Sequence, residues 1–360
     1  MPFVPYRLGM TTIARQETHH RSPSGAGRLA RASTFALGAA LLVYLLYGFG
    51  SAKVWLDLKS IGWGFVGIVA LEALVSAINA RAWWRTLPNR TRHGSLVRLL
   101  LVQLAGSALN ESVPAGPVYG EPIKVLLLKD QFPASVTTAS LLSSKVAQAL
   151  ARALFVILGM LAASWSLKLE HLPVQSLAVG FILTAAGVGA FMVLQMRGLS
   201  GPARRVSARL RFLGSWVERL EHGLGRVDEH LQELYTARLS DFVASVVLAL
   251  AGLGVGVVQV WLMLGWIGLE RDWLSSLTIE AFSVLVSFVS FVIPGSLGVQ
   301  EGGKLLIFAA LGLPLSAGLS VGVAFRLNNI VTILEGLAAL AWLRPHRMFQ
   351  AARLDAARRS

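Results

Sequence analysis

Charged and amide side chains lie inside apolar stretches of this 360-residue sequence, where they could bind an anionic ligand. A charged group within a membrane segment is costly to bury, so each one is a candidate functional residue. Arginine binds phosphate through two parallel hydrogen bonds, and lysine contributes a compact charge. The substrate-binding residues that we predict are Glu121, Lys124, Lys145, Arg152, Glu301, Lys304, Arg326 and Asn329.

Two Glu-x-x-Lys pairs follow breaks that are rich in proline and glycine. Glu121 and Lys124 lie three residues apart, as do Glu301 and Lys304, so each pair can share a helical face and neutralise itself. The alternative to ligand binding is therefore structural, with self-satisfied ion pairs that stabilise a helical hairpin. The recurrence of the pair in both halves of the chain favours the functional interpretation.

Polar stripes on two later segments extend the pattern. Lys145, Gln148 and Arg152 are spaced to lie on one helical face, and Arg326 and Asn329 repeat the arrangement. A buried cation needs a carboxylate, water or an anionic ligand beside it. We expect Lys145 and Arg326 to converge with the two glutamates near the middle of the membrane.

Other residues in the apolar segments are given structural roles. Four glutamates have no counterpart in the other half of the chain, and we expect them to serve helix packing or to lie at an interface. They are Glu72, Glu111, Glu280 and Glu335. Trp83 and Trp84 are predicted to belong to an interfacial aromatic belt.

Several kinds of catalysis are excluded by residues that the sequence lacks. It has no cysteine, and its seven histidines lie outside the predicted membrane segments. Thiolate sites and intramembrane Ser–His pairs or histidine metal clusters are therefore ruled out. No aspartate lies deep in a predicted span, and no phosphate-binding GxxxxGK[ST] loop is present. We expect no enzyme, no cofactor and no metal.

The elements that must position the candidate residues are membrane helices. Hydrophobic residues make up 54% of the chain and charged residues 14%, whereas soluble domains have about 25% charged residues. Because about 20 apolar residues cross a bilayer, we predict an all-α polytopic fold of eight membrane segments. Six are full spans, at 33–50, 61–80, 134–165, 173–196, 239–268 and 314–343. Two are longer and broken, at 95–128 and 275–312.

Proline and glycine interrupt both broken segments, in VPAGPVYGEP (113–122) and IPGSLGVQEGG (293–303). Non-helical backbone at membrane depth must be surrounded by protein or line a water-filled cavity. Each broken segment is therefore predicted to be a re-entrant hairpin, although two full crossings would satisfy the same topology. The predicted break residues are Pro114, Gly116, Gly120, Pro294, Gly295 and Gly298.

The distribution of basic residues orients the segments. The segments rich in arginine are 1–32, 81–93, 197–238 and 344–360. The segments poor in basic residues are 51–60, 166–172 and 269–274. By the positive-inside rule, the rich segments are cytoplasmic, and both termini are among them.

An internal repeat follows from this topology. A shift of 180 residues aligns the two Glu-x-x-Lys pairs, and unit 61–165 then begins on the side of the membrane opposite to unit 239–343. Inverted repeats with broken helices at matching positions are typical of alternating-access transporters. The link 197–238 carries a heptad stripe of Val and Leu, which predicts an amphipathic helix on the inner leaflet, with a coiled-coil dimer as the alternative.

The strings VPAGPVYGEPIKVLLLK, IPGSLGVQEGG, LGLP and AFRLNN, preceded by RAWWR, carry a family resemblance. Over roughly residues 33–343 the sequence resembles the lysylphosphatidylglycerol synthase transmembrane-region family of flippase-like proteins. The family pattern Pro-Gly-Gly-x-Gly-x-x-Glu, followed by an arginine, is matched except that Ser296 replaces the second glycine. The matching residues are Pro294, Gly295, Gly298, Glu301 and Arg326.

The resemblance implies a flippase-like transmembrane domain over 33–343, between basic cytoplasmic tails at 1–32 and 344–360. It also implies a lipid translocase in a bacterial inner membrane, moving a phospholipid, a polyprenyl-phosphate-linked lipid or a hopanoid. The alternative is a non-catalytic scaffold or accessory subunit of a lipid-synthesis complex. Expected partners are membrane lipids with anionic headgroups, a second copy of the chain or a lipid-synthesis enzyme, and no nucleic acid.

The predicted topology can be tested with single cysteines, because the chain has none of its own. Cysteines placed at positions 55 and 170 should react with impermeant reagents from outside, and those at positions 90 and 215 from the cytoplasm. Labelling of positions 90 and 170 from the same side would rule out the inverted repeat.

Overall fold

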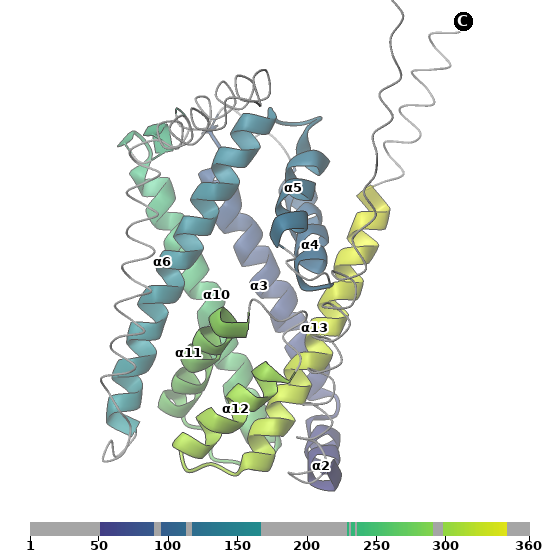
Figure 1. The fold of residues 1–360 in the computed structure, drawn as a ribbon, viewed down its shortest axis with the longest axis vertical. Helices are drawn as coiled ribbons and strands as arrows, with labels where there is room; N and C mark the ends of the chain where they lie inside the picture. The colour runs from purple at the N-terminus through teal and green to yellow at the C-terminus, as the bar shows by residue number, and fades with distance from the viewer. Residues whose placement is uncertain are drawn as a thin grey trace, which may run out of the picture.

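The computed structural model describes residues 51–89, 95–112, 117–166, 229, 232–234, 236–290 and 298–343. Within these ranges the chain is all-helical, as predicted, and its helices form one elongated bundle (Figure 1). The helices are α2 (Ser51–Ile61), α3 (Gly64–Thr86), α4 (Leu96–Ser112), α5 (Pro117–Leu128), α6 (Ala134–Ser166), α10 (Leu239–Trp266), α11 (Trp273–Ser290), α12 (Val299–Ala310) and α13 (Leu315–Leu343).

Four of the described helices, α3, α6, α10 and α13, are long and apolar enough to cross a membrane. They confirm as helices the predicted spans 61–80, 134–165, 239–268 and 314–343. The shortest of them, α3, has 23 residues, which at 1.5 Å per residue is about 35 Å and exceeds a hydrocarbon core of about 30 Å. Two predicted spans, both tails and most of the link lie outside the described residues, at 1–50, 167–228 and 344–360.

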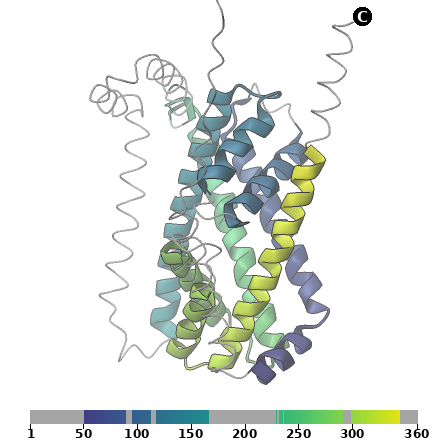
Figure 2. The ribbon, with the colours of Figure 1, turned by 45° about the vertical axis from the view of Figure 1, so that its right-hand side comes forward.

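The two segments predicted to be broken each form a pair of shorter helices. Helices α4 and α5 pack against each other and form the first hairpin, and α11 and α12 form the second hairpin. Helices α5 and α12 have 12 residues each, which corresponds to about 18 Å and is too short to cross the hydrocarbon core. The first hairpin lies in the upper half of Figures 1 and 2 and the second in the lower half.

The predicted break residues differ in their positions. Gly298 precedes α12 with φ of 74°, a backbone conformation that favours glycine, so its assignment to the second break is confirmed. Gly120 lies inside α5, because that helix already begins at Pro117, and its assignment to the first break is wrong. The remaining break residues, Pro114, Gly116, Pro294 and Gly295, lie outside the described residues.

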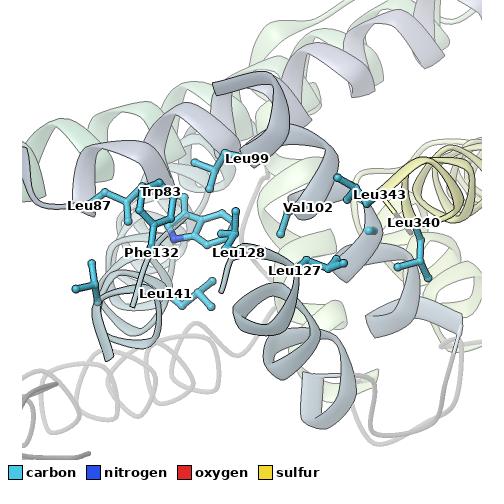
Figure 3. Packing of buried hydrophobic residues seen from close by; sticks show 12 residues of the cluster. Trp83, Leu87, Leu99, Val102, Leu127, Leu128, Phe132, Leu141, Leu340 and Leu343 are labelled. Atoms are coloured by element: carbon cyan, nitrogen blue, oxygen red, sulfur yellow. The ribbon is translucent and has the colours of Figure 1, made fainter. Parts of the chain in front are cut away.

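A hydrophobic cluster closes the upper end of the bundle, where α3, α4, α5, α6 and α13 meet (Figure 3). Trp83 is at its centre, with only 1% of its surface exposed, and its Nε1 donates to Ser140 Oγ at 3.1 Å. The prediction of an interfacial position for Trp83 is therefore wrong. The first hairpin and α6 cover this tryptophan, whereas Trp84 packs at the edge of the cluster, beneath the guanidinium of Arg81.

A second cluster closes the lower end, with residues from α2, α3, α10, α11, α12 and α13 around Phe308 and Ile279. The segment 51–60, predicted as a link, is helical and forms most of α2. Its Asp57 accepts a hydrogen bond of 2.6 Å from Ser320 of α13. Helix α2 is thereby attached to the second unit.

The two units exchange helix contacts in a reciprocal manner. Helix α4 of the first unit packs on α13 of the second, and α11 of the second packs on α6 of the first. Small residues allow the close approach: a side chain at Gly336 would meet α4 at Leu104, and one at Gly159 would meet α11 at Ala281. Helices α3 and α10, the first of each unit, also pack together.

Asp272 provides a testable helix cap at the lower end. Its carboxylate accepts hydrogen bonds from the backbone amides of Leu274 and Ser275, at 3.3 and 2.7 Å. Burial acts against its ionisation, but these bonds and the Ser275 side chain hold the pKa of Asp272 below its usual value. We expect Asp272→Ala to lower the free energy of unfolding by about 1 kcal/mol at neutral pH.

A lowered carboxyl pKa stabilises the fold at neutral pH, and this stabilisation is lost as the pH falls through the folded-state value. Thermal unfolding in detergent, followed from neutral to acidic pH, should therefore show the difference between wild type and Asp272→Ala disappearing in acid. Asp272→Asn keeps the cap without the charge and is the control. Equal stability of wild type and Asp272→Ala at neutral pH would contradict the assignment.

Candidate functional site

A polar cavity of about 430 Å³ lies between the two units. Every long helix and both hairpins contribute to its wall, with α3 and α10 on one side. The volume falls within the range of about 300–1,000 Å³ that is usual for ligand pockets. Its charged and polar lining residues are Glu72, Ser76, Asn79, Gln103, Ser107, Asn110, Glu111, Lys145, Gln148, Arg152, Gln259, Glu280, Ser283, Ser287, Gln300, Lys304, Asn329 and Thr332.

The predicted site residues divide into two groups. Lys145, Arg152, Lys304 and Asn329 line the cavity. Glu121, Lys124, Glu301 and Arg326 lie behind the wall in ion pairs. The structure thus brings half of the predicted residues to a common space and places the others where they hold the hairpins.

In the first hairpin, Glu121 is the centre of a network of donors. Its Oε1 lies 2.9 Å from Lys145 Nζ and 3.1 Å from Lys124 Nζ, and it accepts a hydrogen bond of 3.0 Å from Asn110. Lys124 is 1% exposed and fits against α4 only because position 106 is glycine, where any side chain would collide with it. The network joins α4, α5 and α6.

In the second hairpin, Glu301 pairs with Arg326, whose Nε lies 2.8 Å from Oε1. This pair is the more enclosed of the two: the side chains of Glu301 and Arg326 are 1% and 15% exposed, against 22% and 42% for Glu121 and Lys145. Among the described residues Lys304 takes no part in such a pair, and its ammonium lies 4.7 Å from the centre of the Phe325 ring.

We expected both glutamates and both cations to converge near the middle of the membrane. The structure instead forms two separate pairs, one in each hairpin. The reason is local: the second helix of each hairpin folds back onto the helix that follows it, so each carboxylate meets the cation of its own unit.

Arg152 differs from the cations that pair with Glu121 and Glu301. It lies in the cavity wall on α6, together with Lys145 and Gln148 of the predicted polar stripe. Its surface is exposed in the wall, and within the described part of the chain its guanidinium forms no ion pair or hydrogen bond. A guanidinium in this position is suited to an anion that enters the cavity.

Three glutamates to which we gave packing or interfacial roles line the cavity instead, namely Glu72, Glu111 and Glu280. The fourth, Glu335, does not. A charged residue at membrane depth is by itself a candidate functional residue, and all three glutamates meet this criterion. We gave them structural roles because none has a counterpart in the other unit, and that criterion was misleading. Uncharged amides such as Asn79, Gln103 and Gln259 gave no signal in the sequence.

Comparison with known proteins identifies the family to which this helical architecture belongs. The family described as lysylphosphatidylglycerol synthase TM region matches residues 32–335, which include both hairpins and every residue of the cavity wall. The chain belongs to this family. It is therefore an integral, multi-pass membrane protein.

The chain is also similar to a UPF0104 membrane protein of Methanothermobacter thermautotrophicus. The two sequences are 25% identical over 293 residues, which are 75% of this chain and 82% of that protein. No solved structure matches the chain.

The unequal burial of the two ion pairs predicts unequal costs of breaking them. Arg326→Ala leaves the carboxylate of Glu301 buried and without its partner, which costs about 3–5 kcal/mol. Lys145→Ala leaves Glu121 with Lys124 and Asn110, and we expect a loss of about 1 kcal/mol. Chemical unfolding of detergent-solubilised protein measures both.

Neutralising Glu301 in the Arg326→Ala background is the matched control, because Glu301→Gln removes the stranded charge and should recover part of the loss. Equal losses for Arg326→Ala and Lys145→Ala would show that burial does not distinguish the two pairs.

Proposed function

We propose that this protein is a lipid translocase. It moves a phospholipid, a polyprenyl-phosphate-linked lipid or a hopanoid across or out of the inner membrane, with the headgroup passing through the cavity. The observation that carries the proposal is Arg152, a cation without a partner among the described residues, in the wall of a polar cavity. A phosphate bound there would accept its hydrogen bonds and balance its charge.

The size of the cavity supports a headgroup as the ligand. A volume of about 430 Å³ accommodates a phosphate with a small polar substituent, whereas two acyl chains would have to remain outside in the lipid. Serine, asparagine and glutamine side chains of the wall can bind the polar substituent. Lys145, on the same helix as Arg152, and Lys304 on α12 add positive charge to the same wall.

The arrangement of the units supports movement by alternating access. We infer that units 61–165 and 239–343 are inverted repeats, each with a re-entrant hairpin, since the hairpins lie in opposite halves of the bundle and the helix contacts are reciprocal. Rocking of one unit against the other would open the cavity first to one membrane face and then to the other. The arginine-rich links favour a cytoplasmic position for both termini.

The proposal assigns no enzymatic step to the chain, and the lack of cysteine and of histidine in the membrane segments supports this. A scaffold in a lipid-synthesis complex is the alternative. A purely structural role gives no reason for a guanidinium in the wall of a polar cavity that pairs with no other described residue.

Reconstitution into liposomes with a fluorescent phospholipid tests the proposal. Wild-type protein should accelerate the exchange of lipid between leaflets, and Arg152→Ala should reduce the rate by at least about tenfold, the effect of losing roughly 1.4 kcal/mol of binding. Arg152→Lys should retain part of the rate, and Lys129→Ala, an exposed cation outside the cavity, is the control with the wild-type rate.

The same liposome experiment gives a different result for each competing function. A change in the mass of the lipid would indicate an enzyme, and the absence of any exchange with well-folded wild type would indicate a scaffold. Exchange at the wild-type rate by folded Arg152→Ala would contradict the role of the cavity.

A further inference from the structure

Lys145 belongs both to the cavity wall and to an ion pair. Its side chain lines the cavity and is 42% exposed, yet its ammonium lies 2.9 Å from Oε1 of Glu121, on α5 of the first hairpin. Arg326, which pairs with the glutamate of the second hairpin, is 15% exposed and lies behind the wall. Of these two cations, Lys145 is therefore the one that a ligand in the cavity can reach.

Lys145 and Arg152 share one face of α6 and can bind one anion together. They are two turns apart, about 10 Å along the helix, and Gln148 lies between them in the same wall. Both side chains are long, and the lysine stem is flexible. A phosphate bound at Arg152 would thus lie within reach of the Lys145 ammonium and would compete with Glu121 for it.

Glu121 can release Lys145 without losing its counter-charge. Its Oε1 also lies 3.1 Å from Lys124 Nζ and accepts a hydrogen bond of 3.0 Å from Asn110. Lys124 is 1% exposed and packs closely on α4 at Gly106, so it stays beside the carboxylate when Lys145 leaves. A buried carboxylate that keeps a cation avoids the large cost of a stranded charge. The exchange of Lys145 between two anions is therefore inexpensive.

The bond between Glu121 and Lys145 also joins two sides of the bundle. Helix α5 packs closely on α4, since a side chain at Gly120 would collide with Asn110. Helix α4 in turn packs on α13, whereas α6 packs on α11 (Figure 1). The ion pair thus connects α4, α5 and α13 with α6 and α11. Its loss would weaken the attachment of the first hairpin to α6.

We propose that Lys145 exchanges partners during transport. It binds Glu121 when the cavity is empty, and it binds the phosphate of a lipid headgroup together with Arg152 when the cavity is filled. Entry of the headgroup thereby releases the first hairpin from α6 and leaves the ion pair of the second hairpin in place. This inference rests on the proposed function, since it takes a lipid phosphate as the ligand of the cavity.

Competition between Glu121 and the phosphate gives a distinctive test, because neutralising this carboxylate should strengthen binding. The measurement is isothermal titration of the full-length protein in detergent with dihexanoyl phosphatidylglycerol. Freeing Lys145 by Glu121→Gln should tighten binding by about threefold to tenfold, and Lys145→Gln should weaken it by about tenfold. In the Lys145→Gln background, Glu121→Gln should bring no gain, whereas a general effect of removing a negative charge would persist there.

Two further proteins keep this titration interpretable. Glu121→Gln leaves Lys124 buried without its counter-charge, so Glu121→Gln/Lys124→Met, which removes both charges and also frees Lys145, takes its place if the single variant does not fold. Lys129→Ala, at an exposed position outside the cavity, is the matched control and should bind like wild type. Titration with inorganic phosphate separates a headgroup from free phosphate, and we expect it to bind more weakly than the lipid.

Release of the hairpin can be followed with a single cysteine, since the chain has none. Leu141 lies one turn from Lys145 on the same face of α6, is 6% exposed and belongs to the cluster that contains Leu127 and Leu128 of α5. The cysteine of Leu141→Cys should react with a soluble thiol reagent faster when dihexanoyl phosphatidylglycerol is bound. In the Lys145→Gln background it should react fast with or without the lipid.

Several results would overturn the inference and leave the proposed function intact. They are unchanged or weaker binding by folded Glu121→Gln, a gain that persists in the Lys145→Gln background, and a cysteine at position 141 whose reactivity does not respond to the lipid. Equal affinity for inorganic phosphate and the lipid would overturn the assignment of a headgroup as the ligand. If folded wild type binds no headgroup, the proposed function fails and the exchange fails with it.

Discussion

The structure depends on the need to satisfy charges inside a medium that contains no water. Glu121 and Glu301 each lie on a helix too short to cross the membrane, and each is held by a cation from the next helix. Without those bonds both hairpins would hold unpaired charges at membrane depth, which is costly. The ion pairs therefore fix the hairpins, and the hairpins in turn form the ends of the cavity between the units.

The reciprocal helix contacts make the cavity a property of the whole bundle. Because α4 packs on α13 and α11 packs on α6, every wall of the cavity includes helices from both units. Glycines at the two crossings allow the backbones of the packed helices to approach closely. A displacement of one unit thus changes the shape of the cavity directly.

The sequence predicted the order and approximate bounds of the described helices apart from α2, because hydropathy and proline–glycine breaks act locally. It paired each glutamate with the lysine three residues on and expected the later cations to converge at one place, whereas the structure joins Glu121 to Lys145 and Glu301 to Arg326 in separate hairpins. Trp83 was misplaced because hydropathy does not distinguish a lipid neighbour from a protein neighbour. The isolation of Arg152 and the position of Glu72 in the cavity wall arise from helix rotation in the assembled bundle, which no spacing along the chain records.

The two ion pairs also differ in how strongly the solvent can influence them. Ions in solution screen charges over about 8 Å at physiological ionic strength, but only where water reaches those charges. The bond between Glu121 and Lys145 is partly wetted, whereas the bond between Glu301 and Arg326 is almost sealed. Dissolved salt is therefore expected to weaken the ion pair of the first hairpin more than that of the second, so the two hairpins differ in their response to ionic strength.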